Sequence, residues 1–465
     1  MHDRRNPQPA RGRHDLALGR RPPSDDADDL FRGTSLGTDG ARDLVAMTSE
    51  AIAEAVLSLT SYSDTPVTPA MGDLLRSACI HLLGVGRIAR ECPSTPCWQC
   101  GASRVSQIDL PGSAAEPGGR RHSIGGVVVT GAIAHDRLMR YAGRFSAQLT
   151  AVPGLFGGKR HRLGRPGRHI LSINAQTLTV RRGGIAANIC YGLTQLGIRP
   201  AIVSAVGGDA DGLLMGLTAN GVDARSVLID EQQHTARFDC VMDEDCTQVA
   251  TFDEGAGVRE AEIDLSSVLH RTGGAHLVLI TSASTDAMLR HAGEARAARV
   301  PFVIDPSDRL RQDQLNRSQL RELLDGAAYL VCNSFQRQLI EETTGWGSVE
   351  ILRRVDCLVT TRGPQGVEIE GGGERLSVPP ATAHYYVDPI GVRDAFRSGF
   401  FGGRLLGLSL ADAARLGCVF SATAADVVGS QEYRAGPDDI LKRIRENYSE
   451  EAELAVAGAF AHLMR

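Results

Sequence analysis

The chain has 465 residues, of which 42% are hydrophobic and 23% are charged, so it can form two or three domains, or one large α/β domain with an extension. The formal net charge of −5 gives no overall reason to bind nucleic acid or a membrane surface, and no apolar run reaches the roughly 18 residues of a membrane span. Ten cysteines are scattered along the chain, several in apolar segments, which indicates reduced, buried thiols in a cytoplasmic protein.

The N-terminal quarter differs in composition from the rest of the chain. Residues 1–42 are rich in Arg, Asp, Pro and Gly, so we expect a disordered tail, and its lack of an apolar core excludes a secretory signal. Residues 43–90 contain two stretches with apolar residues three and four apart, which predicts helices. Residues 91–123 resemble a linker. We therefore expect a helical segment and linker at 43–123 and a main domain at 124–465.

Short apolar strands alternate with helical patterns in the main domain. GGVVVTG, at 125–131, has the pattern of a buried strand. Comparable apolar runs predict strands at 201–207, 276–282, 301–305, 327–333 and 356–363. Helical patterns lie between them at 212–221, 285–298 and 334–345. Because such alternation favours a parallel sheet covered on both faces, we expect an α/β fold with a central, mostly parallel sheet.

Two further segments stand apart from these buried strands. TARFDCVMDEDCTQVATF, at 235–252, predicts two polar-alternating strands around an acidic turn, and such a ribbon would stand off the main sheet as a lid. A companion lid strand is expected near 171–182. The basic segment at 154–169 is predicted to be a solvated loop, with attraction of a phosphorylated substrate as the alternative.

RRGGIAANICYGLTQLG, at 181–197, is the first segment that could carry chemistry. Gly183 and Gly184 precede an amphipathic helix, and Asn188 lies one turn into it. Glycines at a helix start let a ligand approach the backbone, and the amides there favour electron-rich oxygens. A Gly-rich turn into a packed helix is the purely structural alternative.

VDPIGVRDAFRSGFFGG, at 387–403, is the second such segment. A turn at 388–391 leads into a helix whose first turn holds Asp394. A carboxylate in that place either caps the helix or acts as a general base beside a phosphate held by the helix amides.

Taken in order, these two segments resemble the two signatures of the ribokinase (PfkB) family. Gly-Gly-x-x-x-Asn is followed about two hundred residues later by Asp-Pro-x-Gly-x-x-Asp-Ala-Phe, and the resemblance runs from Gly126 to Arg465. It implies a ribokinase-like three-layer sandwich with helices on both faces of the sheet and a small β lid. Within the family the chain is most similar to the actinobacterial adenosine kinase branch, through VTGAIAHDRLMRYAGRFS, HTARF, DGAAYL, TGW, TRGPQGV and GSQEY.

The resemblance implies an ATP-dependent kinase that phosphorylates the CH2OH group of a sugar or nucleoside. Asp394 would be the base, and Mg²⁺ would bridge the ATP phosphates. The implied anion hole is formed by the amides of Gly391, Val392 and Arg393. The implied substrate contacts are Asp136, Gly183, Gly184, Asn188 and Phe238. The implied nucleotide contacts are Asn333, Thr361 and Gly363, and no protein residue is expected to bind a metal directly.

Several positions depart from the family pattern. Arg393 stands where Gly-Ala-Gly-Asp has its second glycine, and Ile390 replaces a threonine. The family's Asn-x-x-Glu ends here in Gln336, an amide in place of a carboxylate, although hard cations prefer charged oxygens. A catalytically impaired protein that binds a sugar or nucleoside in a regulatory role is therefore the alternative to an active kinase.

The substrate side also departs from the adenosine kinase branch. That branch has a serine where this chain has Ala132, and two glutamines where it has Asp308 and Arg309. Because charges replace neutral amides, these positions should change which base or sugar is accepted.

Two other motifs are weaker evidence for a binding site. Cys97-Trp-Gln-Cys100 lacks a second pair at zinc spacing, and Gly84-Val-Gly86-Arg-Ile-Ala89 lacks the βαβ context of a dinucleotide site.

We expect a small-molecule sugar or nucleoside as the partner, with no nucleic acid and no membrane. By resemblance, the lid strands could also pair two subunits into a homodimer. Residues 1–123 are either an interaction segment or no part of the functional product.

Overall fold

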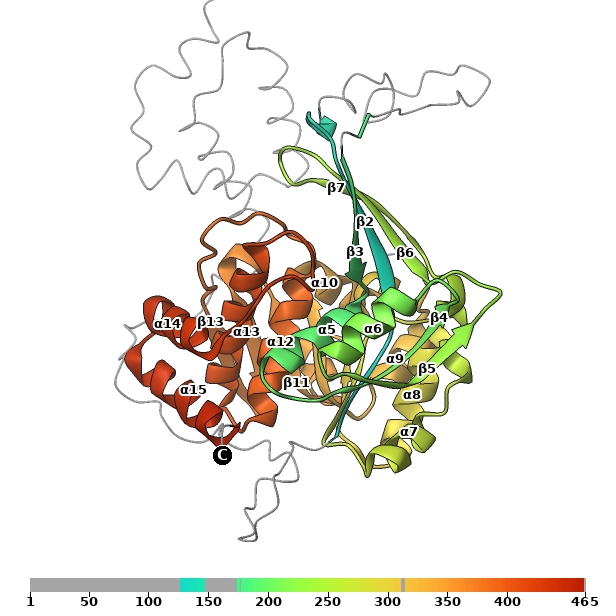
Figure 1. The fold of residues 1–465 in the computed structure, drawn as a ribbon. Helices are drawn as coiled ribbons and strands as arrows, with labels where there is room; N and C mark the ends of the chain where they lie inside the picture. Colours follow the sequence, from blue (N-terminus) through green and yellow to red (C-terminus); the bar gives the residue numbers. More distant parts are fainter. Residues whose placement is uncertain (1–125, 147–173, 176, 311–313, 464–465) are drawn as a thin grey trace, which may run out of the picture. The chain divides into compact units, whose positions relative to one another are not determined.

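The computed structural model describes residues 126–146, 174–175, 177–310 and 314–463 (Figure 1). All of them belong to one of two compact units, Ala102–Arg465. The expected tail, the two N-terminal helices, the linker, the boundary near residue 123 and the basic segment at 154–169 lie outside the described residues. No helix within the described ranges is both long enough and apolar enough to cross a membrane.

A nine-stranded sheet forms the centre of the described part, in the order β13-β12-β11-β10-β9-β8-β1-β4-β5. Its strands are β1 (Val127–Thr130), β4 (Ala201–Gly207), β5 (Asp223–Asp230), β8 (Leu277–Ile280), β9 (Phe302–Ile304), β10 (Ala327–Asn333), β11 (Val355–Thr361), β12 (Val367–Gly371) and β13 (Glu374–Val378). The strands from β11 to β5 are parallel, and β12 and β13 add an antiparallel edge. The predicted, mostly parallel sheet is confirmed.

Helices cover both faces of this sheet (Figure 1). One layer contains α5 (Ile185–Gln195), α6 (Asp211–Ala219), α12 (Val392–Leu405), α13 (Leu410–Ala425), α14 (Pro437–Asn447) and α15 (Glu450–Leu463). The other contains α7 (Leu265–Thr272), α8 (Thr285–Ala297), α9 (Arg317–Leu324), α10 (Ser334–Thr344) and α11 (Ser348–Ile351). Strand β1 supplies both cores, because Val127 and Val129 pack toward the first layer and Val128 toward the second.

A second sheet of four strands, in the order β3-β2-β6-β7, stands off the main one and is called the lid below (Figure 1). Its strands are β2 (Ala134–Arg140), β3 (Thr177–Gly183), β6 (Ala236–Met242) and β7 (Gln248–Asp253). The β6–β7 hairpin coincides with the ribbon predicted at 235–252, and β3 overlaps the range expected for the companion strand, ending one residue beyond it. Strand β2 was not predicted. It follows β1 after three residues, so the chain passes directly from the main sheet into the lid.

Three short 3₁₀ helices complete the described elements that concern the site. They are η2 (Gly255–Glu262), η3 (Ser307–Leu310) and η4 (Gly363–Gln365). The first follows lid strand β7, and the other two follow main-sheet strands β9 and β11. All three therefore begin close to the end of a strand. In open α/β sheets, ligands bind at the carboxyl ends of the strands.

Candidate functional site

Asp394 lies in the first turn of α12, directly after a glycine turn. Gly391 is the N-cap residue with φ 77°, and a Cβ there would come within 2.4 Å of the Cβ of Ser430, so only glycine fits. Among the described residues, no side chain caps this helix, so its first amides are not satisfied by a protein side chain. The Asp394 carboxylate is buried and does not serve as the cap.

Asn188 joins the two segments singled out in the sequence. Helix α5 starts at Ile185 after N-cap Gly184, and the Nδ2 of Asn188 donates a hydrogen bond of 2.9 Å to the Oδ2 of Asp394. The Oδ1 of Asn188 accepts hydrogen bonds from Ser430 Oγ and Gln431 Nε2, both at 2.9 Å. The structure thus brings the glycine pair and the carboxylate to one place.

Asp136, on lid strand β2, is the third polar group of this cluster. It is 3% exposed, and its Oδ2 lies 3.5 Å from Ser430 Oγ. Gly183 makes room for it, because a Cβ at Gly183 would come within 1.9 Å of the Asp136 carboxylate. Burial, together with the nearby charge of Asp394, raises the pKa of Asp136 to about 8. Phe238 is paired with Asp136 across the lid, so both side chains lie on the same face of that sheet.

Arg397 places a positive charge next to Asp394. It is buried one turn further along α12, with its Nη1 3.4 Å from Asp394 Oδ1, and its Nε contacts the carboxylate of Asp305 at the end of β9. Burial raises the pKa of Asp394, while the Arg397 guanidinium, the Asn188 hydrogen bond and the Arg393 charge oppose this rise.

Arg397, Asp305 and Ser430 were not identified as site residues from the sequence. The spacing of Arg397 three residues after Asp394 was an available signal, because i and i+3 side chains are neighbours on a helix. Asp305 and Ser430 had no comparable local signal, since their partners lie far away in the sequence.

The turn before α12 is fixed by a buried carboxylate. Asp388 accepts hydrogen bonds from the amides of Ile390 and Gly429, both at 3.0 Å. The side chain of Arg393 is exposed, although its charge still acts on Asp394. Because it is exposed, the Arg393 side chain can lie outside the glycine turn.

The candidate nucleotide contacts lie at the carboxyl ends of β10 and β11. Asn333 and Thr361 are paired across these strands, and Gly363 follows in a left-handed conformation with open space where a Cβ would stand. Asn333 caps α10: its Oδ1 accepts from the Gln336 amide at 2.8 Å, and Gln336 Oε1 accepts from the Asn333 amide at 2.9 Å. Gln336 is 1% exposed, and its Nε2 has no hydrogen-bond partner in the described part of the chain.

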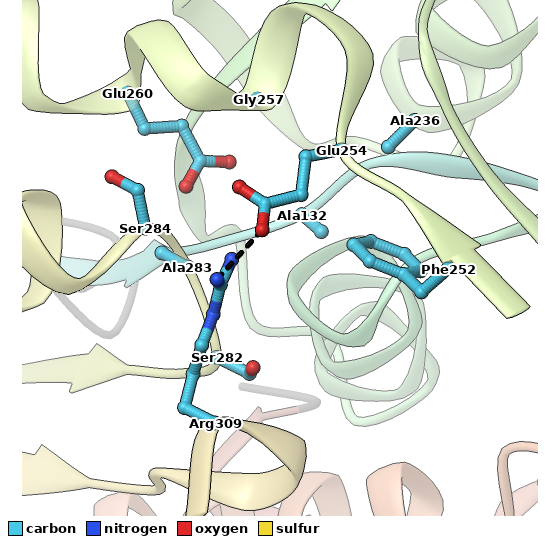
Figure 2. Close-up of a pocket in the computed structure, with 10 residues that line it drawn as sticks. All are labelled: Ala132, Ala236, Phe252, Glu254, Gly257, Glu260, Ser282, Ala283, Ser284 and Arg309. Atoms are coloured by element: carbon cyan, nitrogen blue, oxygen red, sulfur yellow. Dashed lines mark hydrogen bonds and ion pairs between the residues drawn. The ribbon is translucent and has the colours of Figure 1, made fainter. Parts of the chain in front are cut away.

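A small, open pocket lies where the lid meets the main sheet, and its empty space of about 210 Å³ includes open solvent (Figure 2). It is lined by Ala132, Ala236, Phe252, Glu254, Gly257, Glu260, Ser282, Ala283, Ser284 and Arg309. Phe252 is paired with Phe238, which in turn is paired with Asp136. The pocket therefore adjoins the Asp136 cluster along the lid.

The described residues contain no group of three His, Cys, Asp or Glu side chains arranged to hold a metal ion. The arrangement instead offers a buried carboxylate beside free helix amides, with hydrogen-bonding groups for hydroxyls nearby. Such a set can bind a polar acceptor molecule and an anion at the same time.

Comparisons with known proteins agree with this geometry. The family model of the pfkB family carbohydrate kinases matches residues 162–435, more than half of the chain. The nucleoside kinase of Methanocaldococcus jannaschii is 23% identical over 267 residues, which are 57% of this chain and 86% of that protein. The inositol 3-kinase of Oryza sativa is 34% identical over 139 residues, only 30% of this chain and 32% of that protein.

Two solved structures are similar over most of the described part. The Burkholderia thailandensis nucleoside kinase in complex with inosine has a TM-score of 0.62 and 27% identity, covering 69% of this chain and 98% of that one. The M. jannaschii nucleoside kinase, a member of the ribokinase family, has a TM-score of 0.59 and 20% identity, covering 70% of this chain and 100% of that one. At that identity the second likeness concerns the fold alone, and it confirms the ribokinase-like architecture.

Proposed function

Since the chain belongs to the pfkB family of carbohydrate kinases, we propose that it transfers the γ-phosphoryl group of ATP to the CH2OH group of a nucleoside or a sugar. The hydrogen bond between Asn188 and Asp394 carries this proposal. An acceptor held by the Gly183–Asn188 segment would have its hydroxyl beside both the Asp394 carboxylate and the first amides of α12. The nucleoside kinase relatives, and the resemblance to adenosine kinases, favour a nucleoside over a free sugar.

Asp394 acts as the general base in this proposal. It takes the proton of the acceptor hydroxyl while that oxygen attacks the γ-phosphorus, a role that contributes about 10²–10⁴ in rate. Burial opposes the ionised form of Asp394, and Asn188 and Arg397 counter that effect. These partners favour the ionised base, although burial keeps its pKa above the ordinary value.

The first amides of α12, at Gly391, Val392 and Arg393, receive the charge of the transferring phosphoryl group. This role is supported by the absence of a side-chain cap, among the described residues, on a helix of 14 residues. The exposed guanidinium of Arg393 can meet a phosphate oxygen from outside the turn.

ATP would extend from this turn along the carboxyl ends of β10 and β11, past Asn333, Thr361 and Gly363. The open space at Gly363 fits a ligand lying against the backbone. Mg²⁺ would offset the charge of the ATP phosphates. Gln336 fits a metal poorly, because its Oε1 is engaged in the helix cap and its Nε2 is a donor. Mg²⁺ would therefore be held mainly by the phosphates and water.

Asp136 would hold ring hydroxyls of the acceptor, with Gly183 leaving the space and Phe238 packing on the same face of the lid. In the ligand-free protein Asp136 is largely protonated at neutral pH, because its pKa is about 8. A protonated carboxyl can donate as well as accept, which suits hydroxyl groups.

Phosphoryl transfer from ATP to a panel of nucleosides and sugars tests the function directly. We expect turnover with at least one nucleoside, and Asp394→Asn should lower kcat by about 10²-fold or more while the substrate still binds. Binding without turnover across the whole panel would instead support the regulatory alternative, which is favoured by one observation: Gln336 in place of a carboxylate.

We further propose that two subunits pair through the lid. The lid face opposite Asp136 carries Val180 and Val249, which are 55% and 50% exposed, and Val249 is paired with Val241 across the hairpin. The two valines lie on the outer strands β3 and β7 of the same lid face, and exposed apolar side chains can mark an interaction surface. Sedimentation of the purified protein should show a dimer, and Val180→Glu with Val249→Glu should convert it to a monomer.

A further inference from the structure

We infer that Arg309 and Glu254 recognise a nucleobase that carries an N–H group next to a carbonyl, the lactam edge of a 6-oxopurine or of uracil. The inference deepens the proposed function and rests on it, because it names which acceptors the site selects. The starting observation is the pocket between the lid and the main sheet. It contains the charged pair of Arg309 and Glu254, which a small sugar bound at Asp136 would not contact.

The two side chains come from different sheets and meet inside the pocket. Arg309, on η3, is 8% exposed, and its Nη1 lies 2.6 Å from Oε1 of Glu254, which directly follows lid strand β7 (Figure 2). Arg309 also contacts the side-chain carbonyl of Gln314. A largely buried ion pair adds little net stability, because desolvation offsets the attraction. Its place in the wall of a pocket points to ligand recognition.

Glu260 adds a third polar group. It is 2% exposed, accepts a hydrogen bond of 3.2 Å from Ser204 Oγ, and turns its carboxyl group toward the same space as Glu254 (Figure 2). Burial raises the pKa of Glu260 to about 8, although Ser204 and Arg309 oppose the rise. At neutral pH it is therefore mainly a neutral acid. The pocket thus combines a fixed donor, a fixed acceptor and a neutral carboxyl group.

The remaining walls suit a flat ring. Ala132, Ala236 and Ala283 have short side chains, and Phe252 offers an aromatic ring at the lid side (Figure 2). The pairing of Phe252 with Phe238, and of Phe238 with Asp136, places this pocket next to the proposed sugar site. A molecule with its sugar at Asp136 and a ring in the pocket is a nucleoside.

The chemistry of the pair selects among bases. Arg309 can only donate, and ionised Glu254 can only accept. A lactam edge offers a carbonyl oxygen to the first and an N–H to the second, and both hydrogen bonds are charge-assisted. With the sugar fixed at Asp136, adenine and cytosine present an amino group where the lactam has its carbonyl, and an unprotonated ring nitrogen where it has N–H, so donor then meets donor and acceptor meets acceptor. A bidentate match of this kind is worth roughly 5- to 150-fold in discrimination.

The test measures two properties of the full-length protein for inosine, uridine, adenosine and ribose. The first is kcat/KM for phosphorylation by ATP, and the second is the dissociation constant without ATP, by calorimetry. We expect inosine or uridine to exceed adenosine about 10- to 100-fold in both. Arg309→Gln and Glu254→Gln should each reduce that ratio at least fivefold. Arg309→Lys keeps the charge and serves if Arg309→Gln fails to fold.

Arg259→Gln is the matched control, because Arg259 lies on η2 in an ion pair with Asp230 and does not line the pocket. It should leave the preference unchanged. Equal affinity for inosine and adenosine, or an unchanged ratio in both pocket variants, overturns the inference. A binding preference without phosphoryl transfer removes the kinase proposal and supports the pocket assignment, whereas transfer to ribose without nucleoside binding does the reverse.

Discussion

Asp394, the proposed base, is buried, so its ionised form depends on neighbouring charges, and Arg397 supplies one of them. Its guanidinium lies between Asp394 and Asp305, and all three side chains are buried. The hydrogen bond from Asn188 is a second interaction that opposes the rise in the pKa of Asp394. If Asp394 is the base, as proposed, catalysis would depend in part on this neighbouring charge.

Arg397→Met should raise the pKa of Asp394 further, because an opposite charge is lost while burial remains. The base works only when ionised, so activity that is lost on acidification should be lost at a higher pH in the variant, by about 1–3 units. The pH profile of kcat measures this. Arg397→Met also leaves buried carboxylates unpaired, at a cost of about 3–5 kcal/mol, so Arg397→Lys is the folded comparison, with a smaller displacement. An unmoved acidic limb in both variants would count against Arg397 as the positioning residue.

A second prediction for a single residue concerns Gln336. Gln336→Glu keeps an oxygen for the amide of Asn333 but replaces the unpartnered Nε2 by a charged oxygen. We expect the ligand-free variant to be less stable by about 1–3 kcal/mol, because the new charge is buried without a partner. Mg²⁺ with ATP should then stabilise the variant more than the wild type, because hard cations prefer carboxylates. Thermal melts with and without Mg²⁺ and ATP decide this, and an equal shift in both proteins would contradict it.

Among the secondary-structure elements, the glycine turn before α12 is the proposed site of phosphate binding. Gly391 and the Asp388 hydrogen bonds set its shape, and Arg393 is exposed beside it. Arg393→Gly should therefore raise the KM for ATP about 10-fold, through loss of a cationic contact, and leave kcat within a few-fold. Steady-state kinetics with varied ATP measure both constants. A higher kcat in the variant would show instead that the arginine obstructs the anion site.

The secondary-structure elements also show what could and could not be predicted from the sequence. Strands β4 and β10 were predicted at their observed bounds, since each is a buried apolar run next to a helix. Strand β2, AHDRLMR, was missed because its charged residues conceal a half-buried alternation, and β13 was missed because its side chains are mostly exposed. The sequence located Asp394 and Asn188 through their glycine turns. Ser430 could not be found this way, because its bond to Asn188 spans 242 residues.

The whole molecule assembles the site from three separate parts. Asp136 comes from the lid, Asn188 and Asp394 come from two helices of one layer, and Asp305 comes from the carboxyl end of the inner strand β9 of the main sheet. Two carboxyl groups in this assembly, Asp136 and Glu260, are buried with pKa values of about 8. The stability of the molecule should therefore depend on pH in a direction that most proteins with paired surface carboxylates do not show.

The sign follows from proton binding. Between their ordinary pKa values near 4 and about 8, Asp136 and Glu260 hold more protons in the folded than in the unfolded chain, so the free energy of unfolding falls as pH rises. We expect the ligand-free Tm to drop by at least about 4 °C from pH 6 to pH 8, because proton linkage makes each of the two carboxyls contribute roughly 2 kcal/mol. Asp136→Asn and Glu260→Gln should each reduce this drop, because the new amide side chains do not titrate. Asp253→Asn should not reduce it, because Asp253 is exposed at the end of β7. A Tm that is flat or rises over this range would mean that both carboxyls are ionised in the folded protein, so that neither the sugar site nor the base pocket contains the neutral acid described above.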